Sequence, residues 1–187
     1  MSARPLPLRV EFSNQNATYA PYRLWITMVA DTGQDVCFGG TQEQVPFANA
    51  FNNSATYQIS EKKLAHGIDV YSATSLRFYV SLGNPLQAST FAPGGFGAPT
   101  FTNPQDPNWK VRWDIFELTV SSPRSPDDSG DLSTINGYGI PMMIETFNAH
   151  APGAPGTGLT TARSYSGTAP YASLQAMMKT YSVNNNL

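Results

Sequence analysis

Alternation between apolar and polar residues is the feature of this sequence that most restricts its fold. A period of two recurs in residues 6–12, 22–28 and 76–82. Such a period places successive side chains on opposite faces of the backbone, which is the pattern of a half-buried β-strand. Each segment is therefore predicted to be a strand with one dry face and one wet face. Further strands are predicted at Thr56–Ser60, Trp113–Val120 and Ile140–Phe147.

Turn-forming residues separate these strands. The chain of 187 residues contains 15 Gly and 15 Pro, and charged residues make up 13% of it, against about 25% in an average globular domain. Short strands between Gly, Pro and Asn clusters favour an all-β fold, an antiparallel β-sandwich or flattened barrel, over a βαβ fold. Residues 31–53, 87–108 and 121–131 are predicted to be long loops, which are usually functional or disordered.

The composition changes near residue 149. Residues 1–148 are predicted to form the β-sandwich domain, followed by an arm and a helix in residues 149–187. The arm, to residue 167, is rich in Ala, Pro and Gly, and Pro170 can open a short helix over Tyr171–Tyr181. So short a helix needs a surface to pack on, either on the same domain or on a second copy. A homo-oligomer formed through this arm is therefore one prediction.

Charge, cysteine and histidine content exclude several classes of protein. The net charge is −2 and Lys and Arg do not cluster, so neither nucleic acid nor a membrane surface is an expected partner. Cys37 is the only cysteine, which precludes an intramolecular disulfide. His66 and His150 lack the spacing of metal ligands, so no metal and no other cofactor is expected. The N-terminus has no apolar core of a secretory signal, and no apolar run is long enough to span a membrane.

Four blocks of sequence carry a family resemblance. In chain order they are Leu76–Leu86 with a Gly-x-x-Leu turn, Thr102–Asn108 with Asn-Pro-Gln-Asp-Pro-Asn, Trp113–Thr119 with Glu-Leu-Thr, and Ile135–Pro141 with Gly-Ile-Pro. Together they resemble the barrel part of the family 64 glycoside hydrolases, endo-β-1,3-glucanases of the thaumatin-like superfamily. The resemblance implies a thaumatin-like fold, with a β-glucan or a related polysaccharide as partner.

The resemblance also implies an inverting mechanism, in which one carboxyl group is protonated and a second is ionised, about 6.5–9.5 Å apart. Glu117 matches the acidic motif of the family and, on a strand, shares a face with Ile115 and Thr119. From the spacing alone, the alternative is a glutamate that points to solvent or pairs with an arginine such as Arg112. Asp114 faces the opposite side of the strand and is not the catalytic partner.

The second catalytic position departs from the family pattern. Asn136 stands where the family has its catalytic Asp, and an amide does not act as a base at physiological pH. Either Asp131, or Asp127 and Asp128, supplies the missing carboxylate, or the alignment with the family shifts across the loop that precedes Asn136. If none of these holds, the hydrolytic mechanism of the family is severely impaired. Family members also carry a second lobe that forms half of the glucan groove, and no such lobe is expected in this chain.

Candidate sugar-binding residues lie in and after the second block and in the fourth. They are Asn103, Asp106, Trp109 and Tyr138. Amides and carboxylates bind hydroxyl groups, and an aromatic ring stacks against a sugar ring. Short Asn and Asp side chains in Pro-rich turns also bond to their own backbone, so a structural role is the stronger interpretation for the loop.

Three functions remain open from the sequence. The first is a non-catalytic or degenerate β-1,3-glucanase-like domain that binds a glycan. The second is a structural or self-assembling protein that uses the thaumatin-like scaffold, and the third is an active endo-β-1,3-glucanase with a relocated base. Family members are typically secreted, whereas no leader is expected in this chain, so the sequence assigns no compartment.

Overall fold

The computed structural model describes a subset of the chain, and almost all regular structure within it is antiparallel β. The described residues are 7–14, 23–30, 34–47, 54–87, 99, 103–122, 128–133, 140, 142–144 and 165–166. For residues 133, 143, 144, 165 and 166 only the backbone is described. Helical structure in this part is limited to a short 3-10 turn, η2 (Lys62–Leu64), and one further 3-10 residue, Arg23. The predicted all-β fold class is confirmed.

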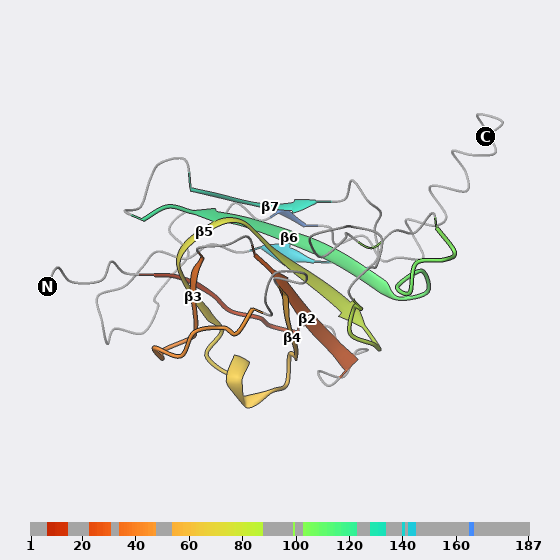
Figure 1. Ribbon diagram of the computed structural model, residues 1–187, viewed down its shortest axis with the longest axis horizontal. Helices are drawn as coiled ribbons and strands as arrows, with labels where there is room; N and C mark the ends of the chain where they lie inside the picture. The colour runs from red at the N-terminus through yellow and green to blue at the C-terminus, as the bar shows by residue number, and fades with distance from the viewer. Residues whose placement is uncertain are drawn as a thin grey trace, which may run out of the picture. The chain divides into compact units, whose positions relative to one another are not determined.

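Seven strands form one open antiparallel sheet (Figure 1). They are β1 (Leu8–Val10), β2 (Leu24–Val29), β3 (Asp35–Phe38), β4 (Ser54–Gln58), β5 (Ile68–Leu82), β6 (Arg112–Val120) and β7 (Ser129–Ser133). The main order is β4-β2-β5-β6-β7, and β1 and β3 pair with β5 as well. A separate two-stranded sheet contains β8 (Met143–Ile144) and β9 (Tyr165–Ser166). The described residues fall into two compact units, one within residues 1–137 and one within residues 138–187.

The long strand β5 pairs with two different sets of strands. Near its start, Asp69 is paired with β1 on one side and with β3 on the other. Near its end, Tyr79 is paired with β2 and with β6. The register with β6 shifts between Ala73 and Leu76, and Ser75 in this bulge has a φ of 54°. A bulge bends and twists a strand, and β5 curves visibly between its two sets of partners (Figure 1).

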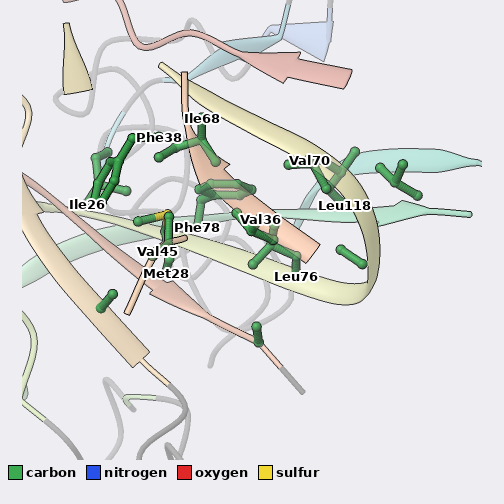
Figure 2. Packing of buried hydrophobic residues seen from close by; sticks show 14 of the residues in the cluster. Ile26, Met28, Val36, Phe38, Val45, Ile68, Val70, Leu76, Phe78 and Leu118 are labelled. Atoms are coloured by element: carbon green, nitrogen blue, oxygen red, sulfur yellow. The ribbon is translucent and has the colours of Figure 1, made fainter. Parts of the chain in front are cut away.

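The main core fills the space between the two halves of β5. Its labelled members in Figure 2 are Ile26, Met28, Val36, Phe38, Val45, Ile68, Val70, Leu76, Phe78 and Leu118. Phe78 is fully buried and stacks on Phe116, with ring centroids 5.5 Å apart. Burying a side chain of this size stabilises the fold by about 1.5–3 kcal/mol. The bend in β5 is thus what allows residues from both halves to share one core.

The other face of β2, β5 and β6 is also largely buried, which corrects the expectation of one wet face per strand. Its second apolar cluster consists of Val29, Tyr79, Leu86, Trp113 and Ile115. The Tyr79 and Trp113 rings meet edge to face at 5.6 Å. Even Thr27 and Ser81 on this face are almost inaccessible to solvent. Polar alternation in sequence therefore does not mark exposure here, because tyrosine and tryptophan bury large apolar rings.

Two of the segments predicted to be long loops contain strands. β3 lies within residues 31–53 and pairs with β5, and β7 begins within residues 121–131 and pairs with β6. The first half of β5 extends the strand predicted at residues 76–82 back to Ile68. The arm and the helix predicted in residues 149–187 lie outside the described residues, apart from the backbone of β9.

A buried carboxylate fixes β1 and the turn after β3 to β5. Asp69 is 2% exposed, and its oxygens accept hydrogen bonds from Arg9 Nε at 2.7 Å and Arg9 Nη2 at 3.0 Å. The Gly40 N–H also donates to Asp69 at 2.8 Å, from a left-handed backbone with φ +72° that favours glycine. The hydrogen bond to Asp69 raises the pKa of Arg9.

Candidate functional site

Glu117 lies on β6 at the centre of a small polar cluster. Its Oε1 atom accepts a hydrogen bond from Ser75 Oγ at 2.7 Å, and its Oε2 atom accepts one from Arg77 Nε at 3.1 Å. The side chain is 34% exposed, so solvent reaches it. The register pairs Glu117 with Arg77. Of the two alternatives for this residue, the arginine pair is present, but the partner is Arg77 on β5 rather than Arg112.

The bulge in β5 brings Ser75 to Glu117. The Ser75 N–H donates to Thr119 Oγ1 at 3.2 Å, and Arg77 Nη2 donates to Ser75 Oγ at 3.3 Å. Thr119 and Glu117 are two positions apart on β6, so their side chains share a face, as predicted. Asp114 pairs with Val80 and is buried on the other face, which agrees with its exclusion as catalytic partner.

Arg77 joins this cluster to the buried aromatic residues of the same face. Burial raises the pKa of the Tyr79 hydroxyl, and the charge of Glu117 raises it further. The charge of Arg77 and its hydrogen bond to Tyr79 act in the opposite direction. For Arg77 itself, burial lowers the pKa, but the hydrogen bond to Glu117 and further interactions leave it raised overall. Arg77 therefore stays a cation between Tyr79 and Glu117.

Asp131 lies directly opposite Glu117 on the neighbouring strand β7. Directly opposed residues of an antiparallel pair have Cβ atoms about 4.5–5.5 Å apart and project from the same face. Asp131 is exposed. Two carboxylates, one arginine and one serine therefore meet on this face at the junction of β5, β6 and β7.

A pocket of about 210 Å³ lies beside the β5 bulge. It is lined by Gln34, Ser72, Ala73, Thr74, Thr119, Val120, Ser121 and Ser122. Most of these residues carry hydroxyl or amide groups. Two of the walls are held by side-chain oxygens, because the Thr74 N–H donates to Gln34 Oε1 and the Ser121 N–H donates to Asp128 Oδ1, each at 2.7 Å. Thr119 is shared between the pocket and the polar cluster.

Two polar side chains of the second sequence block, Asn103 and Asp106, accept hydrogen bonds from backbone groups of their own turn. Asn103 Oδ1 accepts a hydrogen bond from the Gln105 N–H at 3.0 Å, and Asp106 Oδ1 accepts one from the Asn108 N–H at 2.7 Å. Asp106 is buried. Trp109 follows this turn with 37% of its surface exposed and is the exposed large hydrophobic residue of the described part of the chain. The turn thus presents an indole ring to solvent.

The remaining candidates are placed as follows. Asn136 and Tyr138 lie outside the described residues. Within the described part, no cluster of His, Cys, Asp and Glu has the makeup of a metal site. No helix among the described residues has the length and apolar character needed to cross a membrane.

Sequence reasoning did not single out Ser75 or Arg77. Arg77 carried a signal, because alternation placed it on the polar face of its strand. The pairing of β5 with β6 is a long-range contact, however, and local patterns do not supply it. The bulge that brings Ser75 to the same carboxylate has no local sequence signature either.

An all-β domain with a carboxylate-bearing face is the class of protein that the fold and the cluster define. Residues 10–161 match the family model of glycoside hydrolase family 64, described as β-1,3-glucanase. The chain therefore belongs to this family, as its four sequence blocks indicated. No curated protein matches the chain in sequence.

Two solved structures resemble the chain in fold. The β-1,3-glucanase domain (GH64) from Clostridium beijerinckii has a TM-score of 0.57 at 14% identity, over 89% of this chain and 47% of that chain. The laminaripentaose-producing β-1,3-glucanase from Paenibacillus barengoltzii, complexed with laminarihexaose, has a TM-score of 0.50 at 19% identity, over 78% and 38%. The chain thus spans less than half the length of either structure.

Proposed function

We propose that this chain binds β-1,3-glucan on the face that carries Glu117, and that it hydrolyses the polymer very slowly or not at all. Membership of the β-1,3-glucanase family supports the ligand class. The Paenibacillus barengoltzii enzyme, whose structure is a complex with laminarihexaose, has a ligand of the same class. The observation that carries the proposal is the pair of hydrogen bonds from Ser75 and Arg77 to Glu117.

These two hydrogen bonds suit a carboxylate anion better than a catalytic acid. A general acid of a glycosidase must carry a proton to give to the leaving oxygen. In this cluster both oxygens of Glu117 accept hydrogen bonds, and an ionised carboxylate acts only as an acceptor. Such an anion still has lone pairs for the hydroxyl groups of a sugar. We therefore assign Glu117 the role of a sugar-binding acceptor.

Two further residues support binding without efficient hydrolysis. Asn136, aligned with the catalytic Asp of the family, supplies no base in this proposal. Trp109 offers an exposed ring, and aromatic rings supply large contact areas with little loss of side-chain freedom. Asn103 and Asp106 then shape the turn that carries Trp109, and Tyr138 remains a proposed contact of the same ligand.

Asp131 favours a second candidate function, a weakly active endo-β-1,3-glucanase with a relocated base. Its position across from Glu117 on β7 places a second, exposed carboxylate beside the first. Under this alternative Asp131 activates the water and Glu117 protonates the leaving oxygen. The two candidates differ in one outcome, which is hydrolysis that depends on Asp131.

Binding is tested by sedimentation with insoluble β-1,3-glucan and by calorimetric titration with laminarihexaose. We expect Glu117→Gln and Trp109→Ala each to weaken binding by about 10-fold, the loss of one charge-assisted hydrogen bond or one stacked ring. The matched control is Glu43→Gln, because the Glu43 side chain is 61% exposed and pairs with Lys63 away from this face. Wild-type affinity in the Glu117→Gln variant would exclude this face as the binding site.

Hydrolysis is tested in the same preparations by release of reducing ends. We expect wild-type release close to that of Glu117→Gln, whose amide is no acid. Robust release that disappears in Asp131→Asn would establish the second candidate in place of the first.

A further inference from the structure

Ser75 has an unusual backbone conformation for its residue type. Its φ is 54°, and in the described part of the chain it is the one residue other than glycine with a positive φ. This region brings the Cβ atom of an L-residue close to its own backbone, so residues other than glycine, asparagine and aspartate rarely adopt it. A conformation of this kind persists only where its surroundings hold it, and such positions cluster at functional sites.

Three hydrogen bonds surround Ser75, and two of them involve its side chain. Its N–H donates to Thr119 Oγ1, which fixes the backbone of the bulge against β6. Its Oγ donates to Glu117 Oε1 at 2.7 Å and accepts from Arg77 Nη2 at 3.3 Å. A glycine would adopt the same backbone without strain, but it would make neither side-chain contact. The serine is therefore the residue that supplies a donor at a place where the backbone favours glycine.

We propose that Ser75 is a positioning residue for Glu117, and that its left-handed conformation directs Oγ toward the Glu117 carboxylate so that this carboxylate holds one orientation for a sugar ligand. The inference rests on the proposed function for the identity of the ligand. Its geometric part, the coupling of Ser75 to Glu117, stands on the hydrogen bonds alone.

Ser75 and Arg77 divide the carboxylate between them. Ser75 binds Oε1 and Arg77 binds Oε2, so rotation of the carboxylate would break both contacts. Each oxygen keeps a lone pair for a further donor, and the side chain is 34% exposed. An oriented acceptor binds a hydroxyl group with less loss of side-chain freedom than a mobile one. The strained serine therefore contributes to affinity without itself touching the sugar.

The test compares Ser75→Gly with Ser75→Ala. Both variants remove the hydroxyl group, but only alanine keeps the Cβ atom that makes the left-handed conformation unfavourable. We expect the glycine variant to unfold at a temperature a few degrees above that of the alanine variant. We expect both to bind laminarihexaose about 3- to 10-fold more weakly than the wild type, by the same factor. If both variants lose the same factor in binding affinity although their stabilities differ, the loss arises from the positioning of Glu117 and not from a structural role of Ser75.

Three results would overturn the inference. Wild-type affinity in both variants would show that the hydroxyl group does not position Glu117. Affinity that follows the unfolding temperature would show that the residue acts only through stability. Equal stability of the alanine and glycine variants would show that the left-handed conformation of Ser75 is not strained.

A double-mutant cycle keeps the test independent of the ligand. Unfolding temperatures are compared for Ser75→Gly, Glu117→Gln and the double variant. We expect the double variant to lose less stability than the sum of the single variants, because the two side chains share one hydrogen bond. If the wild type does not bind laminarihexaose, the proposed function fails and this cycle alone decides the inference; additive losses would then overturn it.

Discussion

Asp131 and Glu117 lie directly opposite each other on the antiparallel strands β7 and β6. Like charges in this position repel each other across the ladder. Arg77 pairs with Glu117 from the other side, on β5, and limits the effect. The result is a row of one positive and two neighbouring negative charges across three strands, with the exposed Asp131 at its outer end.

Removing the outer charge is expected to stabilise the protein slightly. Asp131→Asn should raise the free energy of unfolding by a few tenths of a kcal/mol at low salt, since opposed like charges contribute at this scale. The gain should disappear in about 1 M salt, where the screening length is about 3 Å. Urea denaturation at both salt concentrations measures it. A change of equal size in low and high salt would mean that the charge pair is not its cause.

Restoring the family carboxylate is expected to increase hydrolysis. Asn136→Asp should raise whatever rate of reducing-end release exists by about 100-fold, the typical contribution of a positioned general base. Asn136→Ala serves as the control and should leave the rate where it is. If Asn136→Asp had no effect while the wild type turned over robustly, the base would lie elsewhere.

The buried carboxylate of Asp69 is expected to dominate the attachment of β1. Asp69→Asn weakens the paired hydrogen bonds to Arg9, and because the Arg9 side chain is 44% exposed its charge stays hydrated, so we expect a loss of about 2 kcal/mol in the free energy of unfolding. Asp35→Asn is the matched control, because the Asp35 carboxylate accepts its hydrogen bond from Gln44 at the surface. Urea denaturation measures the free energy of unfolding of both variants. Losses of similar size would show that the Asp69 carboxylate does not hold β1 to β5.

The raised pKa of Tyr79 makes a prediction for alkaline pH. Burial is the first cause of the shift, so the folded protein holds the phenol proton to higher pH than the unfolded chain. The resulting stability is complete below about pH 10, the ordinary value for tyrosine, and is lost as pH rises through the folded value. Tyr79→Phe removes this group. Its free energy of unfolding should therefore fall less steeply above about pH 10, and an unchanged slope would contradict the assignment.

Local sequence patterns predicted the strands whose alternation is regular and missed those whose pairing depends on distant partners. The alternating residues 76–82 form the second half of β5, as predicted. The strand β7 has the sequence Ser-Gly-Asp-Leu-Ser, which shows no dry face, and its position follows from the ladder with β6. β3 has only four residues, with Val36, Cys37 and Phe38 all buried, so it shows no alternation either.

The candidate site was predictable only in part, because pairing between distant strands brings some of its residues together. The Glu-Leu-Thr motif identified Glu117 and the face that it shares with Thr119. The partner Arg77 depends on the register of β5 against β6, forty residues away in the chain. The contact of Ser75 with Glu117 depends on a bulge in β5 that no residue type in the sequence predicts. Tertiary pairing, not local propensity, sets the chemistry around the carboxylate.

Glucan binding without efficient hydrolysis is tested by measuring both activities of the chain in one sample. Wild-type chain and Glu117→Gln are incubated with insoluble linear β-1,3-glucan, and the sedimented protein and the released reducing ends are both determined. We expect the wild type to sediment with the polymer, Glu117→Gln to sediment about 10-fold less efficiently, and neither protein to release reducing ends at an appreciable rate. Rapid release by the wild type that is lost in Glu117→Gln would show instead that Glu117 is a working catalytic acid.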